Sequence, residues 1–398
     1  MSDARQGLVR AIHQFVPSLA ARDAIGSHTL AVQTLLREMG FESEIFADEI
    51  KLELDGRAQP YARYRRQAYR ADTWLLYQSS IGSPIAGFLA ERREPKILNY
   101  HNITPAHLLE GWDPYVGEAV TNGRRQLELL APGVSAAIAV SSFNRMELVL
   151  AGYRSVAVAP PLIDLQAFDQ PADAATLRRL EDAKVGGGRS LLFVGRISPN
   201  KAQHDLVKML FAYRRVYDPL AQLHLVGASF SDSYREALLS FAHSLGLEGA
   251  VHLAGSVTPG QLAAYYQAAD AFVCCSDHEG FCIPLLEAMY HRLPIVAYGA
   301  AAVPETVGGG GLVIETKEPA RMAAAVHRVL SDPGLRQALI VTGQAHLSDF
   351  RLERTKAQFA AAVTTAISRP AGQPPVGQSP VGQPRLGHRV VRHTSGRV

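Results

Sequence analysis

Short apolar runs alternate with longer amphipathic stretches along most of the chain. The apolar runs have the length of buried strands, and the stretches between them repeat apolar residues at helical spacing. The expected strands are 7–16, 73–78, 96–100, 136–140, 156–159, 190–194, 222–226, 250–254, 271–275 and 294–297. The expected helices include 27–39, 117–130, 144–151, 203–217, 234–245 and 284–291. This alternation predicts an α/β protein whose parallel sheets carry helices on both faces.

The alternation occurs twice, which predicts two doubly wound domains. Between the two sets, residues 173–189 combine a charged segment with a run of three glycines, so we place the interdomain linker there. The expected division is an N-terminal Rossmann-like domain at 1–175, a second one at 176–350 and a C-terminal helix at 351–368. Residues 369–398 contain Gly-Gln-Pro repeats, and we predict a disordered basic tail because they bury too little apolar surface to fold.

Charge is placed unevenly. The chain carries a net charge of +3, but its last thirty residues hold five arginines and no acidic residue. The rest is slightly acidic, which gives a nucleic-acid partner no electrostatic support.

No apolar run reaches the roughly 18 residues that span a bilayer, and the first ten residues lack a signal pattern. We therefore expect a cytoplasmic protein, and structural roles for Cys274, Cys275 and Cys282, which lack zinc-site spacing.

The first chemical motif is LLFVGRISPNKAQHD, residues 191–205. Gly195 follows a buried strand and lets the backbone approach a ligand closely. Arg196 and Lys201 then place two cations beside the start of a helix, where amide groups and the helix dipole add to their charge. The motif predicts a diphosphate site, and the alternative is a solvated Arg and Lys in a loop.

The second motif is CSDHEGFCIPLLEAM, residues 275–289, with Glu279 and Glu287 seven residues apart. Pro284 suits the first turn of a helix, so Glu287 lies about one turn inside it and Glu279 lies in the preceding loop. A carboxylate that accepts two hydroxyl hydrogens is a common way to hold a ribose. The alternative is a capped helix that carries two surface glutamates.

Together the two motifs, GR-x4-K followed by E-x7-E, resemble the retaining glycosyltransferases of family 4. Similar segments are HQFVPSLAARDAIGSH, NYHNITP, HLVG and AVPETVGGGGLVI, so the resemblance extends over most of residues 7–350. It implies a GT-B fold, in which two Rossmann-like domains face a central cleft. It also implies that the N-terminal domain binds the acceptor, that the C-terminal domain binds the nucleotide-sugar donor, and that the last helix returns to the N-terminal domain.

The resemblance assigns roles to particular residues. Arg196 and Lys201 are expected to neutralise the donor diphosphate, Glu287 to bind the ribose hydroxyls, and Glu279 to contact the donor sugar. The remaining residues implied at the donor site are Gly26, Gly195, Gly280, Phe281 and Cys282. Two of these depart from the family pattern. Cys282 stands where the family usually has glycine, and the first loop has one glycine, Gly26, where many relatives have two.

His101 resembles the active-site histidine of the family, on the N-terminal domain near the transferred sugar. A single histidine at a strand end is more often structural. The resemblance favours a functional role, in which the imidazole hydrogen-bonds a sugar hydroxyl or eases proton movement near the anomeric centre.

The expected activity is retaining transfer of a hexose from a nucleoside-diphosphate sugar, with GDP-mannose favoured, to a hydroxyl of a glycan or lipid-linked saccharide in surface-polysaccharide synthesis. No Asp-x-Asp pair is placed for a diphosphate, so we expect no metal and no cofactor. Alternatives are a UDP-glucose- or UDP-GlcNAc-dependent transferase of a small natural product, and a non-catalytic sugar-nucleotide-binding protein. A dehydrogenase would need Gly-x-Gly-x-x-Gly after its first strand, which is absent.

The segment YARYRRQAYR, residues 61–70, predicts either a peripheral contact with an anionic membrane or acceptor, or a solvated face.

Overall fold

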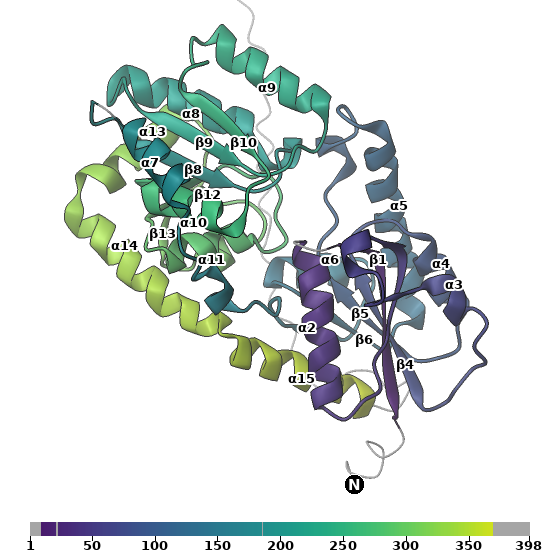
Figure 1. Ribbon diagram of the computed structural model, residues 1–398. Coiled ribbons are helices and arrows are strands. Elements are labelled where there is room, and N and C mark those ends of the chain that lie inside the picture. Colours follow the sequence, from purple (N-terminus) through teal and green to yellow (C-terminus); the bar gives the residue numbers. More distant parts are fainter. Residues whose placement is uncertain (1–8, 21–22, 185, 369–398) are drawn as a thin grey trace, which may run out of the picture.

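The computed structural model describes residues 9–20, 23–184 and 186–368 (Figure 1). These residues form two β-sheets with helices packed around them, and the order of strands is β3-β2-β1-β4-β5-β6-β7 in the first sheet and β10-β9-β8-β11-β12-β13 in the second. Neighbouring strands pair in parallel, as in β1 with β4 and β8 with β11. The doubly wound α/β architecture is therefore the one that the sequence predicts. The predicted tail at 369–398 lies outside the described residues.

The N-terminal sheet and its helices come from the first part of the chain. Its strands are β1 (Ala11–Leu19), β2 (Ile45–Ile50), β3 (Gln59–Pro60), β4 (Thr73–Ser79), β5 (Lys96–Tyr100), β6 (Ala136–Ala139) and β7 (Val156–Val158). Its helices are α2 (Ala24–Glu38), α3 (Tyr61–Tyr64), α4 (Pro84–Glu91), α5 (Pro114–Leu130) and α6 (Ser142–Leu150), with short 3-10 turns between elements. Four of these helices, α2, α4, α5 and α6, begin after an Asp or Ser whose side chain accepts a first-turn amide hydrogen.

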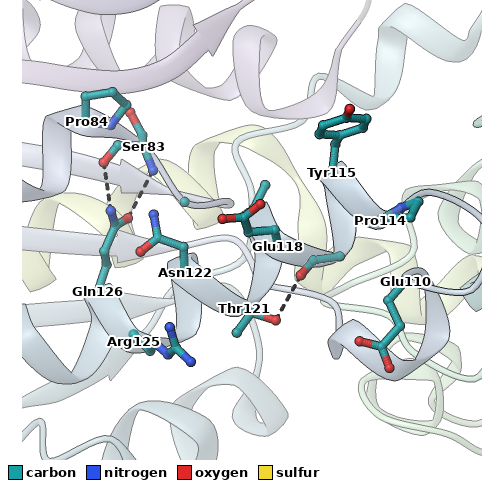
Figure 2. Close-up of a pocket in the computed structure, with 13 residues that line it drawn as sticks. Ser83, Pro84, Glu110, Pro114, Tyr115, Glu118, Thr121, Asn122, Arg125 and Gln126 are labelled. Atoms are coloured by element: carbon teal, nitrogen blue, oxygen red, sulfur yellow. Dashed lines mark hydrogen bonds between the residues drawn. The ribbon is translucent and has the colours of Figure 1, made fainter.

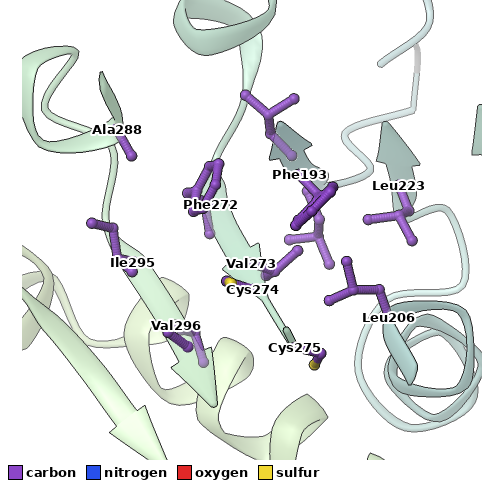
Figure 3. Close-up of a cluster of buried hydrophobic side chains, with 14 of the residues drawn as sticks. Phe193, Leu206, Leu223, Phe272, Val273, Cys274, Cys275, Ala288, Ile295 and Val296 are labelled. Carbon is purple, nitrogen blue, oxygen red and sulfur yellow. The ribbon is translucent and has the colours of Figure 1, made fainter. Parts of the chain in front are cut away.

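The C-terminal sheet is built from β8 (Ser190–Val194), β9 (Gln222–Val226), β10 (Val251–Gly255), β11 (Ala271–Cys274), β12 (Ile295–Tyr298) and β13 (Gly311–Ile314). Its helices are α7 (Ala174–Asp182), α8 (Gln203–Val216), α9 (Asp232–Ser244), α10 (Pro259–Ala268), α11 (Ile283–Tyr290), α12 (Val303–Val307), α13 (Pro319–Ser331) and α14 (Pro333–His346). Strands β8, β11 and β12 lie at its centre, and their side chains fill the larger hydrophobic core (Figure 3).

The connection between the domains lies earlier than the sequence predicts. Residues 174–182 of the expected linker form α7, which packs against α10. Leu162 still belongs to the core of the N-terminal domain, whereas Ile163 and Leu165 pack against the core of the C-terminal domain. The placement of the linker at 173–189 is therefore wrong. Its polar composition reflects the exposed face of a helix, on which Leu180 is buried.

The last described helix, α15 (Leu352–Ser368), lies against the N-terminal domain beside α2 (Figure 1). Phe359 and Val363 of α15 are fully buried in the same cluster as Ile12 of β1. The ammonium group of Lys356 lies 3.0 Å from Glu38 at the end of α2. The chain thus returns to its first domain after completing the second. Among the described residues, no helix combines the length and the apolarity needed to cross a membrane.

Candidate active site between the two domains

Lys201 and Glu279 form a buried ion pair at the carboxyl ends of the C-terminal strands. Lys201 ends a 3-10 turn after β8, and its Nζ atom lies 2.5 Å from Glu279 Oε2. The hydroxyl of Ser276 donates to the other carboxylate oxygen at 2.8 Å. Burial acts to lower the pKa of Lys201, but the adjacent Glu279 and the thiol of Cys282 raise it above its usual value. The structure therefore holds a fixed positive charge beside a fixed carboxylate.

Glu287 lies in the first turns of α11, away from that ion pair. Tyr266 on α10 donates its hydroxyl to Glu287 Oε2 at 2.6 Å, and burial raises the pKa of Glu287 above its usual value. Cys282 caps this helix with φ of +74°, a left-handed conformation that favours glycine. The family glycine at this position thus meets a backbone requirement, and cysteine occupies it at some cost in strain.

Gly195 and Arg196 follow β8 in a loop that passes close to a second glycine. A Cβ atom at Gly227 would lie 2.1 Å from the carbonyl oxygen of Gly195, so the two loops touch through their backbones. The side chain of Arg196 is exposed and makes no hydrogen bond or ion pair within the described part of the chain. The structure therefore brings Lys201 to Glu279 but leaves Arg196 extended toward solvent.

The loop of the C-terminal domain that contains Gly280, between β11 and α11, contacts the loop of the N-terminal domain that contains His101. His101 follows β5, and its N–H donates to the carbonyl of Ser79 at the end of β4. A Cβ atom on Gly280 would lie 2.8 Å from the carbonyl oxygen of His101 and 2.6 Å from Cβ of Asn102. His101 and Glu279, which are far apart in sequence, therefore lie on opposite sides of one interdomain contact.

A chain of buried amides fixes the imidazole of His101. Gln14 donates to the carbonyl oxygen of Thr29 at 3.0 Å, so its own oxygen accepts from Gln78 at 2.8 Å. This leaves the side-chain oxygen of Gln78 facing Nε2 of His101 at 2.7 Å. The side-chain nitrogen of Asn99 also lies 3.2 Å from Nε2. The contact with the Gln78 oxygen favours the tautomer that carries its proton on Nε2 and leaves Nδ1 as an acceptor. Burial lowers the pKa of His101 to about 3, so the ring is neutral.

A second buried histidine packs beside His101. The centroids of the His28 and His101 rings are 4.9 Å apart, and Nδ1 of His28 accepts the backbone N–H of Leu162 at 3.0 Å. The side-chain nitrogen of Asn99 lies 2.7 Å from Nε2 of His28. Gln78, Asn99 and His28 were not predicted as site residues. Gln78 and Asn99 are polar residues within otherwise apolar strands, which is a signal that could have identified them, whereas His28 lies on α2 and gives no such signal.

Gly26 lies in the first turn of α2 and not in a free loop. Its N–H donates to the side chain of Asp23 at 3.1 Å. A Cβ atom at Gly26 would lie 2.3 Å from the carbonyl oxygen of Ala20. Close backbone packing therefore accounts for this glycine, and a contact with donor phosphate stays a prediction.

Two buried polar atoms beside the Gly280 loop have no partner in the part of the chain that the structure describes. They are Nε2 of His278 and the side-chain nitrogen of Asn144, one from each domain. A Cβ atom on Gly280 would lie 3.3 Å from that nitrogen of Asn144. Burial lowers the pKa of His278 to about 4. Buried polar groups are normally paired, so these two atoms are candidates for contacts with a bound ligand or water.

The predicted backbone contributors Phe281 and Cys282 lie between the two glutamates. Thr306 donates its hydroxyl to the carbonyl of Phe281 at 2.5 Å, which ties the loop to α12. The preceding residue on α12 is Glu305, and its carboxylate reaches across to the N-terminal domain. It accepts the N–H of Ser142 at 2.8 Å and the hydroxyl of the same residue at 3.0 Å. Side chains from both domains therefore close around the Gly280 loop.

A separate cavity of about 750 Å³ lies on the N-terminal domain between the start of α4 and α5 (Figure 2). Gln126 on α5 exchanges two hydrogen bonds with the backbone of Ser83 at one end, each 3.0 Å long. Glu118, Asn122 and Arg125 of α5 also line the cavity. None of the residues predicted for the donor site lines it.

Solved glycosyltransferase structures share this architecture. Anabaena HepE in complex with UDP-glucose superposes with a TM-score of 0.67 over 89% of this chain and 99% of that chain, at 20% identity. WaaG, a glycosyltransferase involved in lipopolysaccharide biosynthesis, superposes with a TM-score of 0.64 over 88% of this chain and 98% of that chain, at 14% identity. The expected GT-B fold is confirmed.

Sequence relatives place the chain in a family. The family described as Glycosyl transferases group 1 matches residues 179–346. A D-inositol 3-phosphate glycosyltransferase of Thermobispora bispora is 30% identical over 299 residues, which are 71% of this chain and 68% of that protein. A GDP-mannose-dependent alpha-(1-6)-phosphatidylinositol monomannoside mannosyltransferase of Mycobacterium tuberculosis is 31% identical over 233 residues, 56% of this chain and 59% of that protein. The chain spans about half the length of several curated relatives that it matches. It belongs to the group 1 glycosyl transferases.

Proposed function

We propose that the protein transfers a hexose, with retention of configuration, from a nucleoside-diphosphate sugar to a hydroxyl of a glycan or lipid-linked saccharide. The observation that carries this proposal is the arrangement of Lys201, Glu279 and Glu287 opposite His101. One cation and two differently held carboxylates surround the start of α11. The loop that carries His101 contacts the Gly280 loop from the other domain, and the imidazole of His101 is neutral.

Each group has a place in such a reaction. Lys201 and the loop amides stabilise the negative charge that grows on the leaving diphosphate, which lowers the barrier more than it strengthens ground-state binding. Glu287 accepts the ribose hydroxyls, and Glu279 contacts the sugar. His101 offers Nδ1 as an acceptor for a sugar hydroxyl. Arg196 joins the diphosphate if its exposed side chain swings toward Lys201 on donor binding.

GDP-mannose is the donor that we favour, because one similar protein is named for its dependence on GDP-mannose. Several other relatives are named for D-inositol 3-phosphate, and this observation favours a small phosphorylated acceptor as the second candidate. UDP-glucose remains the competing donor, since a similar fold binds it. We propose action in the cytoplasm, with a peripheral membrane contact through the arginine-rich segment 61–70, in surface-polysaccharide synthesis.

The test is release of nucleoside diphosphate from GDP-mannose and from UDP-glucose, with Lys201→Ala beside the wild-type chain. We expect Lys201→Ala to lower turnover by more than it weakens donor binding, because its charge matters most as the bond breaks. Lys208→Ala is the matched control, since Lys208 pairs with Asp205 on the surface of α8. Near-normal turnover in Lys201→Ala would contradict the diphosphate assignment. Absence of release from every donor tested would favour a binding protein without activity.

A further inference from the structure

Three side chains that can ligate a metal meet beside the proposed donor site. One ligand atom from each of Cys274, Glu279 and Cys282 lies within 4.8 Å of the others, and all three residues are buried. Cys274 ends β11, Glu279 lies in the following loop, and Cys282 caps α11. A strand end and a helix start therefore bring the two sulfur atoms together next to the carboxylate.

We propose that Cys274, Glu279 and Cys282 bind one borderline-soft divalent metal ion of the zinc type. Two thiolates and one carboxylate are a donor set that suits zinc better than magnesium or calcium, which prefer oxygen alone. Three protein ligands leave a fourth tetrahedral position for water. The site differs from a metal on the donor diphosphate, which we do not propose. This proposal replaces the expectation that Cys274 and Cys282 have structural roles alone.

The charges around the cluster balance when the ion is bound. Binding releases the two thiol protons, so the ligands supply three negative charges and the ion two positive ones. The remaining charge faces the ammonium group of Lys201, 2.5 Å from Glu279. A buried group of charges is tolerated when it is compensated in this way. The surroundings therefore favour a metal with this ligand set.

Ser276 contacts two of the three ligands. Its hydroxyl donates to Glu279 at 2.8 Å and accepts the S–H of Cys274 at 3.4 Å, and the bond to Glu279 is the one that persists when Cys274 loses its proton. Contacts of this kind orient metal ligands and strengthen metal binding. The third ligand, Cys282, has φ of +74°, where glycine would fit without strain. The side chain of Cys282 packs in the core of the C-terminal domain and brings its thiol to the cluster at a cost in backbone strain.

Metal binding would compete with the donor, a consequence that rests on the proposed function. Glu279 would turn its carboxylate to the ion, and Lys201 would balance the cluster instead of the diphosphate. The metal-loaded protein would then bind the nucleotide sugar poorly. A zinc-type ion would thereby act as an inhibitor at the donor site.

Cobalt(II) is the probe, because thiolate ligands give it a charge-transfer absorption that oxygen ligands do not. The reduced, full-length chain is titrated with cobalt, and zinc is then added to displace it. We expect about one equivalent of cobalt with a thiolate band, and at least tenfold weaker binding in Cys282→Gly. That variant should fold, since glycine suits the backbone there, and circular dichroism checks this. Cys275→Ser is the matched control, because Cys275 lies on the other side of β11 (Figure 3) and should keep the band.

The absence of a thiolate band in the wild-type chain would overturn the site, as would an unchanged band in Cys282→Gly. The competition is tested on zinc-loaded, desalted protein. We expect it to bind the nucleotide sugar at least tenfold more weakly than metal-free protein, with no such difference for Cys282→Gly. Equal affinity of the loaded and metal-free wild type would contradict the competition. If no form binds any nucleotide sugar, the proposed function fails, while the cobalt result still decides the metal site.

Discussion

At the scale of single residues, the two glutamates of the motif have different surroundings. The carboxylate of Glu279 accepts hydrogen bonds from an ammonium group and a hydroxyl. Glu287 is held by the phenol of Tyr266, and burial raises its pKa. The first environment suits a group that faces a developing charge, and the second suits one that accepts ligand hydroxyls.

This difference predicts a separation of nucleotide binding from transfer. Glu287→Gln should weaken binding of free GDP or UDP by about 1–3 kcal/mol, the worth of a hydrogen bond to a charged group. Glu279→Gln should leave that affinity nearly unchanged and abolish transfer. Calorimetry on both variants, with turnover measured beside it, decides the matter. Loss of the nucleotide in Glu279→Gln, together with its retention in Glu287→Gln, would reverse the two assignments.

The neutral state of His101 predicts a loss of stability in acid. In the unfolded chain the ring takes up a proton near pH 6.5, but in the folded chain it does so only at about pH 3. Stability is therefore complete above pH 6.5 and falls as the pH drops toward 3. This one histidine contributes a slope of up to about 1.4 kcal/mol per pH unit.

Urea unfolding across this pH range measures that slope. The two tryptophans, Trp74 and Trp112, both lie in the N-terminal domain, so their fluorescence reports on the domain that contains His101. His101→Gln should reduce the slope by about 1.4 kcal/mol per pH unit, whereas His107→Gln, on an exposed residue, should not. An unchanged slope in His101→Gln would mean that the ring takes up its proton at the same pH in the folded and the unfolded chain.

At the scale of elements, α15 completes the core of the domain that begins the chain. Phe359 is fully buried among residues of α2, β1 and β6. Phe359→Ala should lower the free energy of unfolding of the N-terminal domain by about 3–5 kcal/mol, because it leaves a cavity. Gln358→Ala, on the exposed face of the same helix, should change it by less than about 0.5 kcal/mol. Equal, small effects of both would show that α15 is dispensable to this domain.

The sequence predicts most strands of the described chain, but the inner strand β1 lies at Ala11–Leu19 and not at the predicted 7–16. Strands β5, β8 and β9 have the predicted bounds, because apolar residues make up most of each of them. Strand β2, IFADEI, was missed because its second half is polar and exposed near the sheet edge. Strand β13 was missed because the glycines before it read as a loop. The apolar pattern thus identifies strands that are mostly apolar, including the edge strands β7 and β10, and misses strands that are half polar or preceded by glycines.

The site was predictable as motifs, but not as contacts. Spacing and resemblance identified Lys201, Glu279, Glu287 and His101, each at the end of a strand or the start of a helix. Spacing and resemblance could not identify Gln78. Its role depends on the pairing of β4 with β5, which brings its side-chain amide to the imidazole of His101. Long-range partners of this kind follow from sheet order, which residue spacing along the chain does not encode.

At the scale of the whole molecule, the two domains touch at a few defined places. Gly280 packs on the His101 loop, Glu305 accepts hydrogen bonds from Ser142, and Trp112 packs against Tyr234 with ring centroids 5.0 Å apart. Each contact joins a loop or helix end of one domain to the other. The geometry of His101 against Glu279 therefore depends on how closely the domains approach.

Gly280→Ala tests this dependence. Its φ is not positive, so alanine brings no backbone strain within the C-terminal domain. The added Cβ would lie 2.6 Å from Cβ of Asn102, so the domains must separate. We expect the melting temperature to stay unchanged, small-angle scattering to show a larger radius of gyration, and turnover to fall by at least tenfold. Gly249→Ala, where a Cβ meets nothing within 4 Å, is the control. Normal turnover in Gly280→Ala would show that transfer does not require this close approach of the domains.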